Sequence, residues 1–549
     1  MTFKLGPAPF KSLVCGCFSI LNLTLPAQDD DLTGIKIFRA ATTNLYGSGI
    51  RVAQVEADGG ETAGAQTFEV NPTNTGSPNT LFTYMSAAGT NSVYPNSVGV
   101  AAYHPERVGQ FFYGTVGPGQ TADGVATNVA HVDLVDANFF YTEKVEFSPV
   151  NLGDPVINQS YSYGNVSTNA IPPAGQISVD TQQSLDTHFD NYAAQFGVLF
   201  VAAAGQTGTP APPATGYNAI SVAAYSSGAD SATGPTMDNG RCKPDISAPD
   251  ANTSFAAPQV AGAAAVLMQA GLRGDGGPNT NAAVNMRTLK ALLLNGAVKP
   301  AGWTNSAKTP LDARSGAGML NLYNSYRQLA GGRHTNFVVT SVTATAAHPP
   351  ATATNTIGVL SGWDFNTNNS TATADAVNHY CFNVTNSAGK ANFLASATLV
   401  WNRQNGISTI NNLRLYLYNT ANSNLVACST SVVNNVQHLW LPQLAPGRYD
   451  LQVWKAGGTG IVSTAEPYAL AFAFVPMPKL TISKNGTNTT LSWPAYPAGF
   501  VPQGVGGIMG SPAWSTNNLL PLIITNQQAM VVLSATNKMQ AYRLVSPNF

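Results

Sequence analysis

The stretch DANTSFAAPQVAGAAAVLMQAG, residues 250–271, decides the fold because it joins a turn, a hydroxyl and a long run of small apolar residues. From Phe255 to Gly271 nearly every side chain is apolar and many are alanine or glycine, which predicts a closely packed helix that is buried on all sides. Ser254 lies at the start of this helix. Pro258 is expected in its first turn, where a missing backbone N–H costs little.

The position of Ser254 has two interpretations. A helix N-terminus carries partial positive charge and unpaired amides, so it favours a developing alkoxide or oxyanion. Serine is also a preferred N-cap residue, and Ser254 alone would be interpreted as a cap together with Thr253. A nucleophile is therefore indicated only if the surrounding sequence supports one.

The composition restricts the classes of function. The chain has 549 residues, which is too long for one hydrophobic core and predicts several domains. Charged residues make up 10% of the chain and the formal net charge is −1, so there is no basic field to bind nucleic acid or an anionic membrane. The many Asn, Thr, Ser and Gly residues are typical of a secreted, β-rich protein. No later segment has the about 18 unbroken apolar residues of a transmembrane span.

Residues 1–27 are expected to be a secretory signal peptide. Lysines precede an apolar stretch, and Ala27 stands before three acidic residues. A disordered or buried N-terminus is the alternative, because Leu25 is large for the position two before the proposed cut. Export predicts a secreted, extracellular protein and permits a disulfide between Cys381 and Cys428, although their spacing leaves the unpaired state equally open.

Two changes of pattern divide the remaining chain. Residues 28–334 alternate short apolar strands with helical segments, which predicts an α/β layer with a largely parallel sheet. Residues 335–475 carry runs such as LRLYLY between turn-rich loops and predict an all-β sandwich. Residues 476–549 form a third, small β-patterned block.

The run TSFAAPQVAG resembles the serine signature of the subtilase family, G-T-S-x-A-x-P-x-V-x-G. The residues in register are Thr253, Ser254, Ala256, Pro258, Val260 and Gly262, while Asn252 stands where the family has glycine. The resemblance extends over about residues 47–330. It implies a subtilisin-like, seven-stranded parallel sheet flanked by helices, with Ser254 as the nucleophile of a serine endopeptidase.

A nucleophilic serine needs a base and a group that orients the base. HPERVGQFFYG, residues 104–114, is similar to the family's histidine helix, with His104 at its start. His131 is the rival, but it alternates with valines in a predicted strand, where a histidine more often serves packing. His104 is therefore the predicted base.

The acid is expected at the carboxyl end of an early strand. In GIRVAQVEADGG, residues 49–60, Glu56 takes the place of the family's aspartate and Asp58 is the alternative acid, since period-two alternation lets either face the same side. Either carboxylate would accept from the imidazole N–H and fix its tautomer. The chain order acid, histidine, serine is that of subtilisin.

Two further positions follow from the resemblance. Gln206 in VLFVAAAGQTG stands where the family has its oxyanion-hole asparagine, and Ser160 in INQSYSYG lies on the strand that would pair with an extended protein or peptide substrate. Because Asn252, Glu56 and Gln206 all depart from the family pattern, a catalytically impaired, subtilase-fold extracellular binding scaffold is the alternative.

No cofactor is required for this chemistry. The sequence has no His or Cys cluster with metal-ligand spacing, and structural calcium, which often accompanies the family, is not indicated by a motif. Residues 335–475 look like the accessory domains of secreted bacterial peptidases, and residues 476–549, with TLSWPAYPAGF, are similar to small fibronectin-like modules. These blocks could bind substrate, a polysaccharide or the cell surface, or simply shield the protease.

Overall fold

The computed structural model describes residues 32–59, 66–115, 123–226, 228–343, 350, 355–385, 392–506, 514–515, 523–525, 527–534 and 540–546. The expected signal peptide, residues 1–27, lies outside them. The chain forms two compact units. Of the described residues, the first comprises those within Gly47–Lys243 and Asp250–Ala265, and the second comprises residues 32–46, Pro244–Pro249 and those from Val266 onward.

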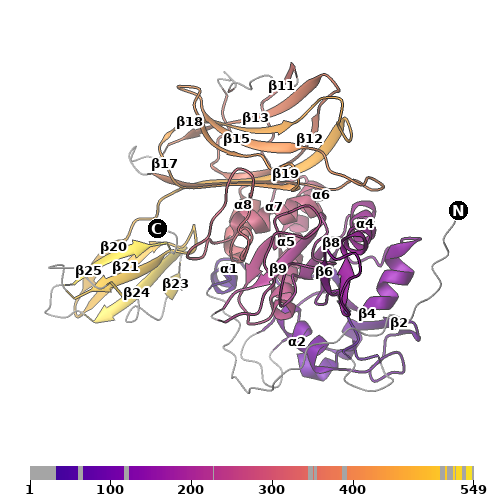
Figure 1. Cartoon of the computed structure of the whole chain (residues 1–549). Coiled ribbons are helices and arrows are strands. Elements are labelled where there is room, and N and C mark those ends of the chain that lie inside the picture. The colour runs from indigo at the N-terminus through magenta and orange to yellow at the C-terminus, as the bar shows by residue number, and fades with distance from the viewer. Residues whose placement is uncertain are drawn as a thin grey trace. The chain divides into compact units, whose positions relative to one another are not determined.

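The first unit is built on a sheet whose strands lie in the order β9-β8-β5-β1-β4-β2-β3. Their bounds are β1 Arg51–Glu56, β2 Phe82–Ser86, β3 Gly89–Asn91, β4 His131–Asp136, β5 Val156–Gln159, β8 Leu199–Ala203 and β9 Ala219–Ala224. Of these strands, β2, β4, β8 and β9 are labelled in Figure 1. Residues along β1, β5, β8 and β9 are almost continuously buried, as expected for a parallel sheet covered on both faces. The predicted α/β class is confirmed.

One edge of this sheet carries an antiparallel strand. Strands β9, β8, β5, β1, β4 and β2 pair in parallel, but β3 is antiparallel to β2. In that pair Ser86 lies opposite Gly89, and a connection this short can only join antiparallel strands. The sheet is therefore mixed at this edge.

The helical elements of the first unit differ in length. They are η1 Pro72–Thr75, η2 Asn79–Leu81, α2 Tyr103–Phe112, α3 Ala137–Phe139, the π-helix η3 Phe140–Glu146 and α4 Val179–Phe196, with the short strands β6 Asn165–Ser167 and β7 Gln176–Ser178 before α4. The Ser178 hydroxyl accepts from the Thr181 N–H at the start of α4, which replaces one missing helical partner. Gly197 ends α4 with a φ of 70°, a conformation that suits glycine.

Helix α5 spans Thr253–Arg273, as the apolar run predicted, and its part up to Ala265 belongs to the first unit. By length and composition it could cross a membrane, but 89% of its most apolar window is buried inside the protein, as in a core helix. A Cβ at Gly262 would lie 2.6 Å from the Cβ of Val125. The glycine therefore permits the close approach of the helix that the small residues indicated.

The second unit contains α1 Ile35–Ala41, β10 Ile246–Ala248, α6 Thr280–Ala283, α7 Met286–Gly296 and α8 Leu322–Ala330, followed by strands only in the described part of the chain. These strands are β11 Val338–Thr343, β12 Ser361–Asn369, β13 Ala374–Val384, β14 Phe393–Trp401, β15 Leu413–Asn419, β16 Leu425–Ser429, β17 Val436–Leu444, β18 Gly447–Lys455 and β19 Ala465–Pro476. They form two antiparallel sheets, β11-β13-β18-β15-β16 and β12-β19-β14-β17.

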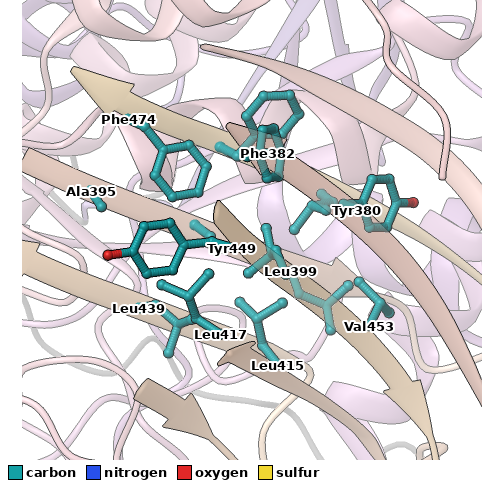
Figure 2. Close-up of a cluster of buried hydrophobic side chains, with 14 of the residues drawn as sticks. Tyr380, Phe382, Ala395, Leu399, Leu415, Leu417, Leu439, Tyr449, Val453 and Phe474 are labelled. Carbon is teal, nitrogen blue, oxygen red and sulfur yellow. The ribbon is translucent and has the colours of Figure 1, made fainter. Parts of the chain in front are cut away.

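One core lies between these two sheets (Figure 2). Tyr380, Leu415 and Val453 come from the first sheet, and Leu399 and Phe474 from the second. Along β15 inward residues alternate with half-buried outward ones, which is the pattern that LRLYLY predicted. Two sheets that share a core in this way form a sandwich.

The last strands form two further small sheets, β20-β21-β24-β23 and β22-β25. Their bounds are β20 Thr481–Asn485, β21 Asn488–Pro494, β22 Val501–Val505, β23 Ile523–Thr525, β24 Gln528–Ser534 and β25 Ala541–Val545. The boundaries expected at residues 334 and 475 stay predictions.

Cys381 and Cys428 do not form the disulfide that export would permit. Cys381 lies on β13 and Cys428 on β16, and strands β18 and β15 run between them. Three strand spacings separate the two residues by about 14 Å, whereas a disulfide needs Cα atoms within about 7 Å. Burial raises the pKa of the Cys381 thiol to about 12, and the Asp450 carboxylate beside it adds to the shift.

Candidate active site

The residues proposed from the sequence converge on the carboxyl ends of the strands in the first unit. Glu56 is the last residue of β1, Ser160 follows β5, and Gln206 lies a few residues beyond β8. His104 and Ser254 lie in the first turns of α2 and α5. In a parallel α/β sheet this edge is where binding and catalytic groups gather.

Glu56 and His104 are in direct contact. The Nδ1 atom of His104 lies 2.9 Å from the Oε2 atom of Glu56. The Glu56 side chain is buried, while 24% of the His104 side chain is exposed. If the carboxylate accepts in this contact, the imidazole proton is on Nδ1, which is the tautomer in which Nε2 can act as a base.

The alternative residues have other partners. Asp58 accepts hydrogen bonds through Oδ1 from the N–H and the hydroxyl of Thr67, at 3.1 and 2.6 Å. His131 contacts Thr83 and Asp133 at the start of β4. In the pairing of β1 with β4, His131 lies opposite Arg51, at the far end of the strand from Glu56.

Ser254 and Ser160 form a reciprocal pair. The Ser160 hydroxyl donates to the Ser254 carbonyl at 2.8 Å, and the Ser254 hydroxyl donates to the Ser160 carbonyl at 3.2 Å. The side-chain amide of Asn158 donates to the Ser160 hydroxyl at 2.9 Å. These bonds join the start of the serine helix to the chain that continues from β5.

Pro258 explains why the Ser254 carbonyl needs a donor from outside the helix. Since α5 begins at Thr253, Pro258 lies in the second turn and not, as expected, in the first. Its N–H would have bonded the carbonyl four residues earlier, which is that of Ser254. The hydroxyl of Ser160 supplies the missing hydrogen bond.

Aromatic packing brings the starts of α2 and α5 together. The ring of Phe255, the residue after Ser254, lies 5.6 Å from the His104 ring and 6.1 Å from the Phe111 ring, measured between centroids. Phe255 and Phe111 belong to a small buried cluster with Val108. The residue next to the candidate nucleophile thus packs against the candidate base.

Gln206 is also at the start of α5. Its Oε1 atom accepts a hydrogen bond from the Thr253 N–H at 3.3 Å. The side-chain amide therefore lies beside the first backbone amides of the serine helix, where a tetrahedral oxyanion would be stabilised.

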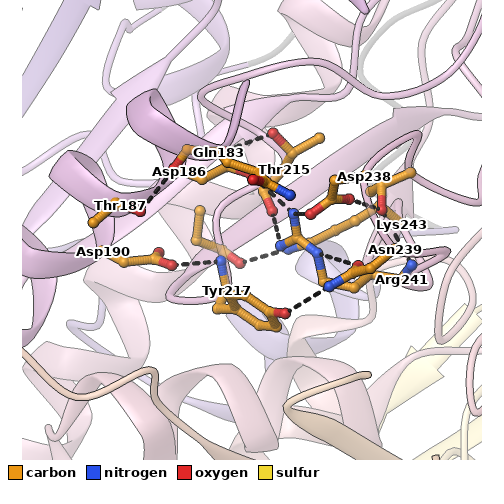
Figure 3. Close-up of polar contacts among 12 residues, drawn as sticks. Gln183, Asp186, Thr187, Asp190, Thr215, Tyr217, Asp238, Asn239, Arg241 and Lys243 are labelled. Atoms are coloured by element: carbon orange, nitrogen blue, oxygen red, sulfur yellow. Dashed lines mark hydrogen bonds and ion pairs between the residues drawn. The ribbon is translucent and has the colours of Figure 1, made fainter. Parts of the chain in front are cut away.

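A buried ion network supports the chain that follows Gln206 (Figure 3). Arg241 contacts Asp186 at 2.9 Å and Asp238 at 2.7 Å, and it also donates to the Thr215 carbonyl. Its guanidinium lies 4.2 Å from the centroid of the Tyr217 ring. Burial raises the pKa of Asp186, even though Arg241 opposes that shift.

Two residues behind Glu56 were not predicted from the sequence. The side chains of Gln54 and Tyr113 continue the hydrogen-bonded row behind Glu56. Period-two alternation along β1 places Gln54 on the same side as Glu56, so this signal was present in the sequence. The contact with Tyr113 had no comparable signal.

No metal-binding group of three or more His, Cys, Asp and Glu side chains occurs among the residues that the structure describes.

Comparisons with known proteins agree with this architecture. Residues 140–318 match the model of the subtilase family, a range that contains Ser160, Gln206 and Ser254 and begins after Glu56 and His104. The chain has the fold of a serine peptidase. The matched part is similar to the subtilase family.

Among solved structures, the chain is similar to MycP1 from the ESX-1 type VII secretion system, with 18% identity, a TM-score of 0.34, and coverage of 54% of this chain and 84% of that one. It is also similar to tripeptidyl peptidase 2, with 12% identity, a TM-score of 0.29, and coverage of 81% of this chain and 52% of that one. At these TM-scores the likenesses carry no argument about activity. The comparison with curated proteins gives no match.

Proposed function

We propose that the protein is a secreted serine endopeptidase that hydrolyses peptide bonds through Glu56, His104 and Ser254. The hydrogen bond between Glu56 and His104 is the observation that carries the proposal, because it pairs an imidazole with a carboxylate that can orient it. The match of residues 140–318 to a peptidase family supports the same reaction class.

In the proposed reaction the Ser254 hydroxyl leaves the Ser160 carbonyl and attacks the peptide carbonyl, while Nε2 of His104 takes the hydroxyl proton. The imidazolium is stabilised by Glu56 and returns the proton to the leaving amine. A water molecule, activated by the same imidazole, then hydrolyses the acyl-enzyme. The Ser254 N–H and the side-chain amide of Gln206 hold the tetrahedral oxyanion.

The proposed substrate is a protein or peptide in extended conformation. Once Ser254 has turned away, the carbonyl of Ser160 can accept from a substrate backbone N–H, as a strand edge does. The steps use groups of the chain and one water molecule, so the proposal requires no cofactor. Secretion, and contact of residues 335–549 with a surface or a polysaccharide, remain part of the proposal.

Labelling with a fluorophosphonate tests the proposal. The wild-type protein is expected to react at Ser254, and the reaction should disappear in Ser254→Ala. Ser178→Ala, which removes only the cap of α4, is the matched control and should keep the label. Wild-type protein that is folded by its thermal melt but does not react would favour the binding scaffold instead.

A further inference from the structure

A hydrogen-bonded row continues from the candidate base into the core of the first unit. His104 contacts Glu56 through Oε2 at 2.9 Å, and the other carboxylate oxygen, Oε1, accepts from Nε2 of Gln54 at 2.9 Å. The Oε1 atom of Gln54 accepts in turn from the Tyr113 hydroxyl at 2.7 Å. Glu56 and Gln54 are fully buried, and Tyr113 is 1% exposed.

Gln54 also contacts the helix that carries the histidine. Its Nε2 atom donates a second hydrogen bond, at 2.8 Å, to the carbonyl of Pro105, the residue after His104. Strand β1 and the start of helix α2 are therefore joined by a hydrogen bond between the His104 imidazole and the Glu56 carboxylate and by one from the Gln54 amide to the Pro105 carbonyl.

Only one orientation of the Gln54 amide satisfies this environment. With Nε2 toward Glu56 and Pro105, both amide hydrogens meet acceptors and Oε1 meets the Tyr113 hydroxyl. A flipped amide would place its oxygen against a carboxylate and a carbonyl, which can only accept. The row thus has a fixed direction, in which each donor points toward Glu56.

Tyr113 is held as the donor at the end of the row. Burial raises the pKa of its phenol well above the usual value, and the charges of the nearby ionisable groups add to the effect, so the hydroxyl stays protonated. A Cβ at position 109 would lie 2.6 Å from this hydroxyl, so Gly109 of the same helix leaves the room that it occupies.

The hydrogen bond from Gln54 matters because the acid is a glutamate and not the shorter aspartate. Glutamate has one more rotatable bond than aspartate, and its terminal torsion is broad. An orienting carboxylate that can rotate would hold the imidazole less firmly. The hydrogen bond from Gln54 fixes the carboxylate oxygen that does not face His104.

We infer that Gln54 is a positioning residue, which fixes the Glu56 carboxylate relative to the first turn of the helix that carries His104, and that Tyr113 sets the direction of its amide. The inference rests on the proposed function for its catalytic consequence, but the hydrogen bonds themselves do not depend on turnover.

Two variants and a control test it in the full-length protein. Gln54→Met keeps a long, unbranched side chain but removes both donors, and Tyr113→Phe removes only the hydroxyl. Gln182→Met, at another fully buried glutamine on α4, is the matched control. Thermal melts establish that each variant is folded.

The first readout is the far-downfield proton resonance of a histidine Nδ1–H that is bound to a carboxylate. The His104 signal is expected in the wild type and in Gln182→Met, and it should broaden or disappear in Gln54→Met. His104→Ala assigns the signal. A signal that is unchanged in Gln54→Met would overturn the inference.

The second readout is peptide hydrolysis. Gln54→Met should lower kcat about 10- to 100-fold with KM changed less than about twofold, because orientation is impaired while the substrate strand is intact. Tyr113→Phe should lower kcat about two- to tenfold. Equal kcat values in wild type and Gln54→Met would overturn the inference.

The two proposals fail in different ways. If the wild type hydrolyses no peptide but its His104 resonance still depends on Gln54, the positioning holds and the proposed function is wrong. If the wild type is active but neither the His104 resonance nor kcat changes in Gln54→Met, the inference about Gln54 is wrong and the proposed function is supported. If Gln54→Met does not fold, Tyr113→Phe decides through the same resonance.

Discussion

The hydroxyl of Ser160 donates a hydrogen bond to the main-chain carbonyl of Ser254, with 2.8 Å between the two oxygens. Four residues along α5, Pro258 has no N–H to donate to this carbonyl. A residue next to β5 therefore completes the first turns of the serine helix, and the candidate nucleophile is fixed from outside its own helix.

The first prediction concerns stability. Replacing Ser160 and Pro258 singly and together tests whether the Ser160 hydroxyl compensates for the N–H that proline lacks. Ser160→Ala should lower the free energy of unfolding by about 1–3 kcal/mol, since it leaves the Ser254 carbonyl without a donor. In a Pro258→Ala background the alanine N–H can bond that carbonyl, and the same change should cost under about 1 kcal/mol. Urea denaturation of the four proteins measures the difference. An identical loss in both backgrounds would contradict the explanation.

The choice between the two acids is the second prediction. Glu56→Gln should lower kcat by about 10⁴, because an amide no longer fixes the imidazole tautomer or stabilises the imidazolium. Asp58→Asn keeps an oxygen that can accept from Thr67 and should change kcat less than about threefold. Steady-state peptide hydrolysis compares them. Loss of activity only in Asp58→Asn would make Asp58 the acid.

The parts of the site that the sequence predicted are those with a local pattern. The serine signature placed Ser254 at the start of α5, and alternation along β1 gave Glu56 and Asp58 as alternatives. The contact that distinguishes these two acids joins residues 48 positions apart, and the one that adds Tyr113 to the row joins residues 59 apart. Such contacts depend on how strands and helices pack, which no short window of sequence contains.

The same limit applies to two features in the rest of the chain. Cys381 and Cys428 share a sheet, but the sequence does not give the order of strands that keeps them apart. The antiparallel edge strand β3 is three residues long and has no apolar pattern of its own. The apolar patterns of the sequence predicted the α/β and β-sandwich layers. The order of the strands within each sheet is known only from the structure.

The amide of Gln206 gives the third prediction. Gln206→Ala should lower kcat about 10²- to 10³-fold, with KM nearly unchanged, because the donor acts on the oxyanion and not on the bound peptide. Gln206→Asn restores the amide on a shorter side chain and reports whether its reach matters. Single-turnover acylation by an active ester measures the affected step. An unaltered rate in Gln206→Ala would remove this residue from the oxyanion hole.

The buried Arg241 gives the fourth prediction. Arg241→Met should lower the free energy of unfolding by about 3–5 kcal/mol, because it leaves Asp186 and Asp238 buried without their cation. Adding Asp186→Leu to this variant removes one of the two uncompensated carboxylates and should recover part of the loss. Chemical denaturation gives the values. A double variant less stable than Arg241→Met would show that the carboxylate of Asp186 is satisfied without the arginine.

The fifth prediction concerns pH and Glu69, a 1% exposed residue whose backbone bonds the segment leading into α2. Burial raises the pKa of its carboxyl from 4.5 to about 7, an effect that the Asn96 side chain and the Gly99 backbone partly offset. The folded protein therefore holds this proton more tightly than the unfolded chain does. Between pH 4.5 and 7 the unfolded chain has lost the proton and the folded protein retains it, so stability falls as the pH rises through this window.

Glu69→Gln removes this titration while it keeps the shape of the side chain. Its free energy of unfolding should match that of the wild type near pH 4 and exceed it at pH 8, where the wild type must bury a charged carboxylate. Urea denaturation at a series of pH values measures both curves, and Glu143→Gln, at an exposed position of η3, should follow the wild type throughout. A stability difference between Glu69→Gln and the wild type that stays constant from pH 4 to pH 8 would contradict the raised pKa.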